Sequence, residues 1–204
     1  MPAIAIDTLH GPASAYVEAV DRPRGAIVLG HGAGGGIAAP DLTAAVAVAR
    51  SLGLTTVLVE QPYRVAGKKA PPPAPRLDDA WLAVIEHLRA QAIGGLPLIT
   101  GGRSSGARVA CRTADATGAA GVLCLAFPLR PPRREGREPA ASRLPELEAV
   151  EVPVLIVQGV NDPFGMPEAA VGRTVVQVAG DHGLKSDLAA VRAAIAAWLP
   201  ALLG

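Results

Sequence analysis

Residues 98–108, which decide the fold, read Leu-Ile-Thr-Gly-Gly-Arg-Ser-Ser-Gly-Ala-Arg. They contain the pattern G-x-S-x-G, with Ser104 at its centre and glycines two residues before and two residues after it. An apolar segment typical of a strand precedes the pattern, and a segment typical of a helix follows it. This is the context of a nucleophile elbow, a tight turn that lifts a serine above the edge of a sheet. The stretch therefore predicts that Ser104 is a nucleophile and that Gly102 and Gly106 make room for the turn.

A serine nucleophile requires a base, and the base requires a carboxylate that orients it. His182, in the segment Ala-Gly-Asp-His-Gly, is the only histidine that follows Ser104 in the chain. Asp162 comes just after a predicted strand at 154–158, where such an acid is expected. Asp181 is the alternative acid, but it adjoins the histidine and would have to reach back around the ring. We therefore expect Ser104, Asp162 and His182 to be the catalytic residues.

Acyl transfer at a serine places negative charge on the carbonyl oxygen, which preorganised N–H groups must stabilise. The backbone N–H of Ser105, directly after the nucleophile, is one expected donor. The second is expected in the loop after a predicted strand at 26–29, which reads Gly-His-Gly-Ala-Gly-Gly-Gly over residues 30–36. We predict that Ala33 supplies this N–H, with Gly34 as the next candidate. His31 is assigned to holding the loop rather than to the chemistry.

The same glycines allow a competing interpretation as a dinucleotide-binding loop. Gly30 to Gly35 match G-x-G-x-x-G after a strand, and Glu60 at the end of a predicted strand could bind a ribose. However, the next helix begins only near Pro40, too late to place its N-terminus on a pyrophosphate. Glu60 also lies 30 residues past Gly30, compared with the usual spacing of roughly 20 residues. This interpretation explains neither the elbow nor the two residues expected to act with Ser104.

Short apolar runs alternate with amphipathic segments along the whole chain, which predicts an α/β fold with a mostly parallel sheet. Most runs from residue 26 onward are continuously apolar, as in strands buried on both faces. The first two runs have no helix between them and are expected to form an antiparallel edge hairpin. The predicted strands are residues 3–6, 15–20, 26–29, 55–59, 96–100, 122–126, 154–158 and 174–178.

Helical patterns lie between these strands, and no internal repeat interrupts them. We expect one helix over residues 41–52, a second capped by Asp78, and a last one capped by Ser186. Two proline-rich segments, 61–76 and 128–145, are expected to be long loops on one scaffold, because the strand–helix pattern resumes after each. We therefore expect residues 1–204 to form a single domain.

The composition excludes several classes of protein. Hydrophobic residues make up 50% and charged residues 18% of the 204-residue chain, which is incompatible with wholesale disorder. No apolar run reaches the roughly 18 residues of a spanning helix, and a net charge of +1 argues against a dedicated nucleic-acid binder. The start of the chain lacks the features of a secretory signal. Cys111 and Cys124 form no metal-ligand pattern, and we expect both to be buried thiols in a reducing cytoplasm.

These motifs together resemble the α/β-hydrolase superfamily. The stretches VLGHGAGGG, GGRSSGARVA, VLIVQGVNDPFG and GDHGL resemble the small dienelactone-hydrolase-like branch, especially the KANL/Tex-type hydrolases. The resemblance spans nearly the whole chain in the right order. It implies an α/β-hydrolase fold of about eight strands, with helices on both faces and no cap domain. It also places Ser104, Asp162 and His182 on the nucleophile, acid and base of the family. True dienelactone hydrolases carry cysteine where Ser104 stands.

The sequence thus predicts a serine hydrolase that cleaves a small ester or thioester without a metal ion or cofactor. We expect it to act as a monomer or homodimer, without nucleic-acid or membrane partners. Arginine and lysine in the two long loops favour an anionic substrate. The alternative is an idle hydrolase-fold protein that binds a partner through its Arg/Pro-rich loop. The residues expected to line the substrate site are Gly34, Arg103, Phe127 and Phe164.

Overall fold

The chain folds around a single eight-stranded sheet with the strand order β1-β2-β4-β3-β5-β6-β7-β8. The computed structural model describes residues 3–132, 138 and 140–203. β1 and β2 form an antiparallel hairpin at one edge, β2 also pairs antiparallel with β4, and every other neighbouring pair is parallel. The strands are β1 (Ala3–Ile6), β2 (Ala13–Glu18), β3 (Gly25–Gly30), β4 (Leu54–Glu60), β5 (Leu98–Arg103), β6 (Gly121–Leu125), β7 (Val154–Gly159) and β8 (Arg173–Val178).

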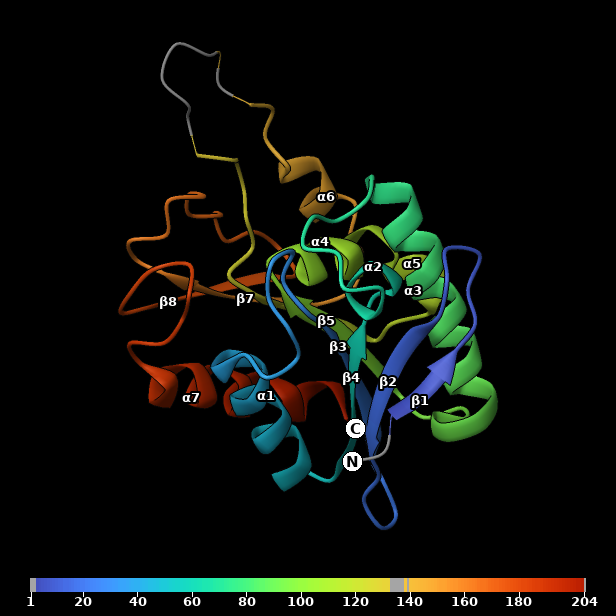
Figure 1. The fold of residues 1–204 in the computed structure, drawn as a ribbon. Coiled ribbons are helices and arrows are strands. Elements are labelled where there is room, and N and C mark those ends of the chain that lie inside the picture. Colours follow the sequence, from blue (N-terminus) through green and yellow to red (C-terminus); the bar gives the residue numbers. More distant parts are fainter. Residues whose placement is uncertain (1–2, 133–137, 139, 204) are drawn as a thin grey trace.

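Helices cover both faces of the sheet (Figure 1). α1 (Pro40–Ser51) and α7 (Leu188–Trp198) pack together on one face. α3 (Ala74–Leu88) and α4 (Ser105–Arg112) pack together on the other. The shorter helical segments are α2 (Pro62–Val65), a π-helical turn at Arg89–Ile93, α5 (Ala114–Thr117), α6 (Leu144–Glu148) and a 3₁₀ turn at Leu199–Leu202. In the part of the chain that is described, no separate helical domain covers the sheet.

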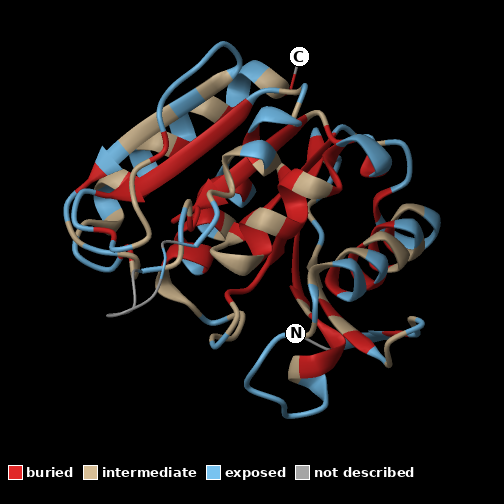
Figure 2. Ribbon diagram, turned by 90° about the horizontal axis from the view of Figure 1, so that it is seen from above, coloured by how far each residue is buried: buried red, intermediate tan, exposed pale blue. Residues whose placement is uncertain are grey.

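The central strands are buried on both faces, as their continuous apolar runs predict (Figure 2). One core cluster joins the sheet to α1 and α7, a second joins it to α3, and a third joins it to α4 and α6. Cys111 and Cys124 lie in the third cluster as free thiols, with 3.5 Å between their sulfur atoms. The prediction that both cysteines are buried is therefore confirmed.

The predicted fold class, with its parallel centre and antiparallel edge hairpin, is confirmed. The largest errors in strand position are at β2, which begins and ends two residues earlier than expected, and at β5. β5 continues to Arg103, so the first glycines of the elbow belong to the strand itself. The nucleophile therefore follows the sheet without any intervening loop.

Both predicted helix caps were wrong. α3 begins at Ala74 after Pro73, and Asp78 lies inside it, because prolines are tolerated in the first turn of a helix. α7 is capped by Asp187, whose carboxylate accepts a hydrogen bond from the N–H of Ala190 at 2.9 Å, and not by Ser186. The two proline-rich segments are also less irregular than expected. The first contains α2 and the start of α3, and the second contains the start of α6.

Candidate active site

Ser104 occupies a strained turn between β5 and α4. Its backbone has φ 52° and ψ −105°, and a positive φ is unfavourable for any residue with a Cβ atom. The turn is held by a hydrogen bond from the Ser104 N–H to the carbonyl of Leu125, at 2.9 Å. Strain of this kind persists where the surrounding structure enforces it, and it aims the side chain out of the sheet.

The glycines of the elbow are required by packing. A Cβ atom at Gly102 or Gly106 would collide with the carbonyl oxygen of Gly30, at the end of β3. β3 pairs with β5 at this point, with Gly30 opposite Gly102. The prediction that these two positions must lack side chains is therefore confirmed, and the close approach fixes the elbow against β3.

The structure brings Ser104, His182 and Asp162 together. Nε2 of His182 lies 2.9 Å from Oγ of Ser104, and Nδ1 of His182 lies 2.8 Å from Oδ2 of Asp162. The histidine follows β8 and the aspartate follows β7, so both come from loops at the carboxyl ends of neighbouring strands. Asp181 instead accepts a hydrogen bond from the N–H of Gly183, at 2.8 Å. This chain of contacts can pass a proton between the serine and the imidazole.

The carboxylate of Asp162 is held from several sides. Its side chain is 1% exposed. Oδ2 also accepts a hydrogen bond from Nε2 of Gln158 at 2.7 Å, and Oδ1 accepts one from the N–H of Phe164 at 2.9 Å. The ring of Phe164 packs on the imidazole of His182, with 4.3 Å between centroids. Aspartate and histidine are therefore fixed in position relative to each other.

The side chains of His31 and Tyr63 anchor the loop after β3. Nε2 of His31 accepts the N–H of Gln61 at 3.1 Å, so Nδ1 carries the proton and donates to the carbonyl of Gly32 at 2.8 Å. Burial lowers the pKa of His31, which keeps the ring neutral. The hydroxyl of Tyr63 donates to the carbonyl of Ala33 at 2.7 Å, and burial raises the pKa of Tyr63 to about 12. His31 holds the loop, as predicted, and Tyr63 is an anchor that the sequence analysis missed.

This loop lies beside the nucleophile. A Cβ atom at Gly32 would be 3.7 Å from the Cβ of Ser104. In the described part of the chain, no acceptor is hydrogen-bonded to the backbone N–H of Ser105 or of Ala33. Both groups thus meet one requirement of an oxyanion donor, an N–H that is not already bonded within the described residues. Gly34, one residue further, is exposed.

Arg103, which directly precedes the nucleophile, is held by two partners. Its Nε lies 3.0 Å from Oδ2 of Asp41, a carboxylate with no exposed surface in the first turn of α1. Its Nη2 donates to the carbonyl oxygen of His182, at 2.9 Å. Burial raises the pKa of Asp41, and the charge of Arg103 opposes that shift. Arg103 thus links α1 to the loop that carries the histidine, and its place in the substrate site stays a prediction.

Phe127 was predicted wrongly as a substrate contact. Its side chain has no exposed surface and packs in the core cluster against α4 and α6. Its carbonyl accepts a hydrogen bond from Nε2 of Gln158, at 3.1 Å. Of the two phenylalanines, only Phe164 lies next to His182.

The geometry does not suit the dinucleotide interpretation. Glu60 accepts a hydrogen bond from the hydroxyl of Tyr16 at 2.9 Å, and α1 begins only at Pro40. Among the described residues, no cluster of His, Cys, Asp or Glu could hold a metal ion. None of the helices in the described ranges is long and apolar enough to cross a membrane.

Comparison with known proteins agrees with this geometry. The family model described as "Alpha/beta hydrolase domain" matches residues 23–188. A serine hydrolase without a lid from Xanthomonas campestris superposes with a TM-score of 0.73 at 23% identity, covering 95% of this chain and 91% of that one. Est1E from Butyrivibrio proteoclasticus, solved with ferulic acid, gives 0.77 at 17% identity, covering 98% and 99%. A dienelactone hydrolase from Anabaena variabilis gives 0.74 at 16% identity, covering 98% and 96%. No curated protein matches the sequence.

Proposed function

Because the chain belongs to the alpha/beta hydrolase family, we propose that it is a serine hydrolase that cleaves a small carboxylic ester or thioester. One observation carries the proposal: the continuous contact from Oγ of Ser104 through the ring of His182 to the buried carboxylate of Asp162. Both steps of this contact, from Oγ to Nε2 and from Nδ1 to Oδ2, are of hydrogen-bonding length, and the serine lies on a strained elbow. That combination is what nucleophilic catalysis by serine requires.

In the first half of the proposed reaction, Oγ of Ser104 attacks the carbonyl carbon while Nε2 of His182 takes the hydroxyl proton. The carbonyl oxygen becomes an oxyanion that the N–H groups of Ser105 and Ala33 stabilise. The bond to the leaving group then breaks, and the alcohol or thiol departs with the proton from Nε2. Asp162 accepts the Nδ1–H bond throughout, so it fixes the tautomer and stabilises the imidazolium.

In the second half, water replaces the alcohol or thiol. Nε2 of His182 removes a proton from water as its oxygen attacks the acyl-enzyme. The tetrahedral intermediate collapses, the bond to Oγ breaks, and Ser104 regains its proton from Nε2. The products are a carboxylic acid and the free enzyme.

An active-site-directed fluorophosphonate probe tests this proposal. We expect the probe to label wild-type protein at Ser104 and to leave Ser104→Ala unlabelled, while the two proteins have similar melting temperatures. The hydrolysis of p-nitrophenyl acetate should disappear in the same variant. A folded wild-type protein that resists the probe would instead support the idle, partner-binding alternative. Hydrolysis that survives in Ser104→Ala would contradict the assignment of the nucleophile.

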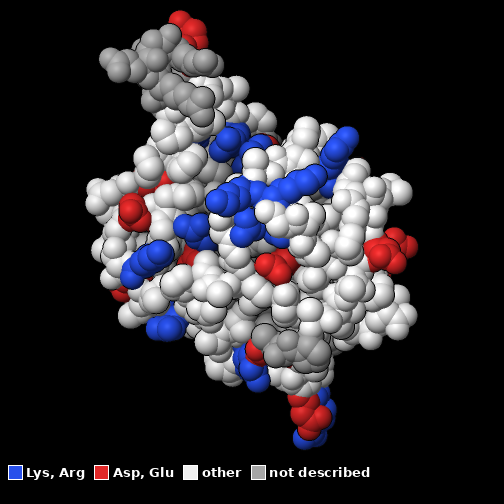
Figure 3. Space-filling view, in the orientation of Figure 1, with Lys and Arg blue, Asp and Glu red and all other residues white. Residues whose placement is uncertain are grey.

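We also propose that the substrate carries negative charge. Lysine and arginine side chains gather across the face of the molecule over α2 and α4 (Figure 3). The segment 61–76 carries Arg64, Lys68, Lys69 and Arg76 and no acidic residue. Several of the charges expected in the second segment, namely Arg133, Arg134, Glu135 and Arg137, lie outside the described residues. Arg103 is paired with Asp41 and does not contribute.

Matched esters test the charge preference separately from the mechanism. We expect kcat/KM to be higher for a carboxylate-bearing ester than for a neutral ester of the same size, and to fall for the charged ester as salt is added. Equal kcat/KM values, or no effect of salt, would show that the basic side chains are merely solvated.

A further inference from the structure

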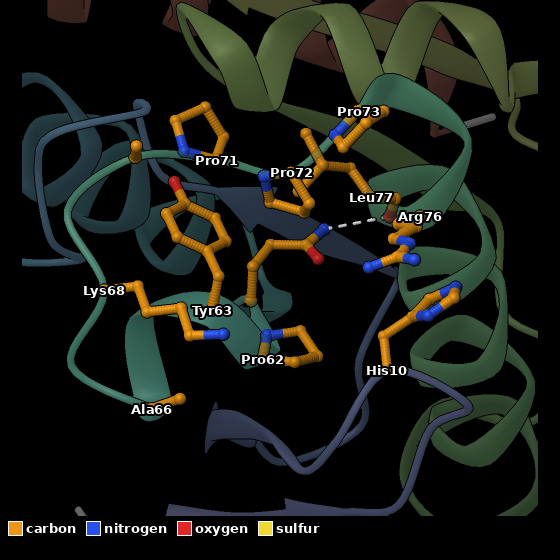
Figure 4. Close-up of a pocket in the computed structure, with 12 residues that line it drawn as sticks. His10, Pro62, Tyr63, Ala66, Lys68, Pro71, Pro72, Pro73, Arg76 and Leu77 are labelled. Atoms are coloured by element: carbon orange, nitrogen blue, oxygen red, sulfur yellow. Dashed lines mark hydrogen bonds between the residues drawn. The ribbon is translucent and has the colours of Figure 1, made fainter.

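A cavity of about 360 Å³ lies between α2, the proline segment 71–73 and the first turn of α3 (Figure 4). Its volume is at the lower end of the range for small-molecule sites, roughly 300–1,000 Å³. Ser104 does not line it. The cavity has flat walls, formed by the prolines and the ring of Tyr63. Its size and shape suit a small flat molecule.

Two cations face each other across this cavity. The side chains of Lys68 and Arg76 point into it from opposite sides (Figure 4). In the described part of the chain, neither side chain takes part in a hydrogen bond or ion pair. His10, at the same rim, pairs with Asp79 at 3.0 Å. None of the described residues that line the cavity is acidic. The like charges of Lys68 and Arg76 are therefore not neutralised, and an anion between them would be attracted to both.

Gln61 also lines the cavity. Gln61 is 6% exposed, and its Nε2 donates to the carbonyl of Leu77 at 3.2 Å. Its Oε1 is buried and has no hydrogen-bond partner among the described residues. Because this oxygen is buried, a molecule in the cavity does not reach it, and Gln61 contributes only to the shape of the wall. The first turn of α3 also lines the cavity, and its positive end adds to the attraction for an anion.

From these contacts we infer that the cavity lined by residues 71–73 is a binding site for a small, flat carboxylate. The carboxylate lies between Lys68 and Arg76, and the apolar body packs on Tyr63 and the prolines. The site is separate from the serine and does not depend on its chemistry.

The occupant would touch the residues that hold the loop beside the nucleophile. Tyr63 donates to the carbonyl of Ala33, and the N–H of Gln61 donates to His31. A ligand packed on Tyr63 and Gln61 would therefore stiffen the anchors of that loop.

Calorimetric titration tests the inference without any catalytic step. The protein is Ser104→Ala, the probe is 4-hydroxybenzoate, and the matched neutral probe is 4-hydroxybenzamide. We expect the carboxylate to bind on the order of tenfold more tightly than the amide at low salt, because two partly exposed ion pairs each contribute modestly. Added salt should remove most of the difference. Equal affinities for the two probes would overturn the inference.

Two further variants place the anion. In the Ser104→Ala background, Lys68→Gln with Arg76→Gln should bring the affinity for the carboxylate down to that for the amide. Lys69→Gln, which removes a neighbouring exposed charge that does not line the cavity, should leave it unchanged. If the carboxylate binds the double variant as tightly as it binds the parent, the anion lies elsewhere and the inference fails. Melting temperatures of the variants establish that they are folded.

Discussion

Replacing Arg103 by methionine tests the link between α1 and the histidine loop. The substitution retains an unbranched apolar side chain but removes the guanidinium group that lies 3.0 Å from Oδ2 of Asp41. Removing one partner of a buried ion pair costs roughly 3–5 kcal/mol, because it leaves the other charge buried and alone. Arg103 retains 18% side-chain exposure and Asp41 has none, so we expect the lower end of that range, about 3 kcal/mol. For a chain of this length, that corresponds to a fall in melting temperature of roughly 6–12 °C.

The cost should depend on pH in a defined direction. Burial raises the pKa of Asp41 above its ordinary value of 3.8, and the charge of Arg103 lowers it. Without Arg103 the folded-state pKa rises further, so the folded variant binds a proton that the unfolded chain has already lost. Stability therefore falls as pH increases from 3.8 through the folded-state pKa. The destabilisation of Arg103→Met should thus be smaller near pH 5 than near pH 7.5.

Urea denaturation at the two pH values measures the effect, with Arg103→Met combined with Asp41→Asn as the matched control. The control removes the stranded charge and should recover most of the lost stability. If the free energy of unfolding of Arg103→Met lies within about 0.5 kcal/mol of the wild-type value, the ion pair does not stabilise the fold. If the control is no more stable than the single variant, the loss has another cause.

Three other substitutions test the site. The free energy of unfolding of Ser104→Gly, measured in urea, should be about 1 kcal/mol higher than that of Ser104→Ala, because only glycine tolerates φ 52° without strain. Equal free energies of unfolding would show that the elbow is not strained. Asp162→Asn should lower kcat/KM on the order of 10²–10⁴-fold, and more than Asp181→Asn; the reverse ranking would identify Asp181 as the acid. Burial lowers the pKa of His31 below 6.5, so the unfolded chain binds a proton that the folded protein does not, and the melting temperature of the wild type should decrease as pH falls below 6.5. The melting temperature of His31→Gln should decrease less over the same range. Equal decreases for the two proteins would contradict a buried, neutral His31.

The parts of the fold that local sequence determines could be predicted. Continuous apolar runs gave the buried strands, because a strand covered on both faces has no polar side to alternate with. The G-x-S-x-G pattern placed Ser104 at the elbow, because no side chain fits where the turn meets Gly30. Asp162 and His182 were placed from their positions after predicted strands, and the structure brings them to the serine.

The sequence analysis failed where contacts between residues far apart in the chain determine the position of a side chain. Phe127 was expected to be a substrate contact, but the packing of α4 and α6 encloses it. The partnership of Arg103 with Asp41 joins residues far apart in the chain, and no local pattern indicates it. Tyr63 lies in a proline-rich segment that was expected to be irregular, so its hydrogen bond to Ala33 was not foreseen.

The position of Gly30 explains how the two halves of the candidate site are kept in register. Its carbonyl oxygen occupies the space that side chains at Gly102 and Gly106 would need, so β3 packs directly against the elbow. The loop that carries Ala33 begins directly after the same glycine. One close backbone contact therefore sets both the turn that carries Ser104 and the starting point of the loop with the second expected N–H donor. His31 and Tyr63 then fix the rest of that loop to the segment after β4. Preorganisation of the two expected N–H donors would thus depend on glycine packing first and on side-chain hydrogen bonds second.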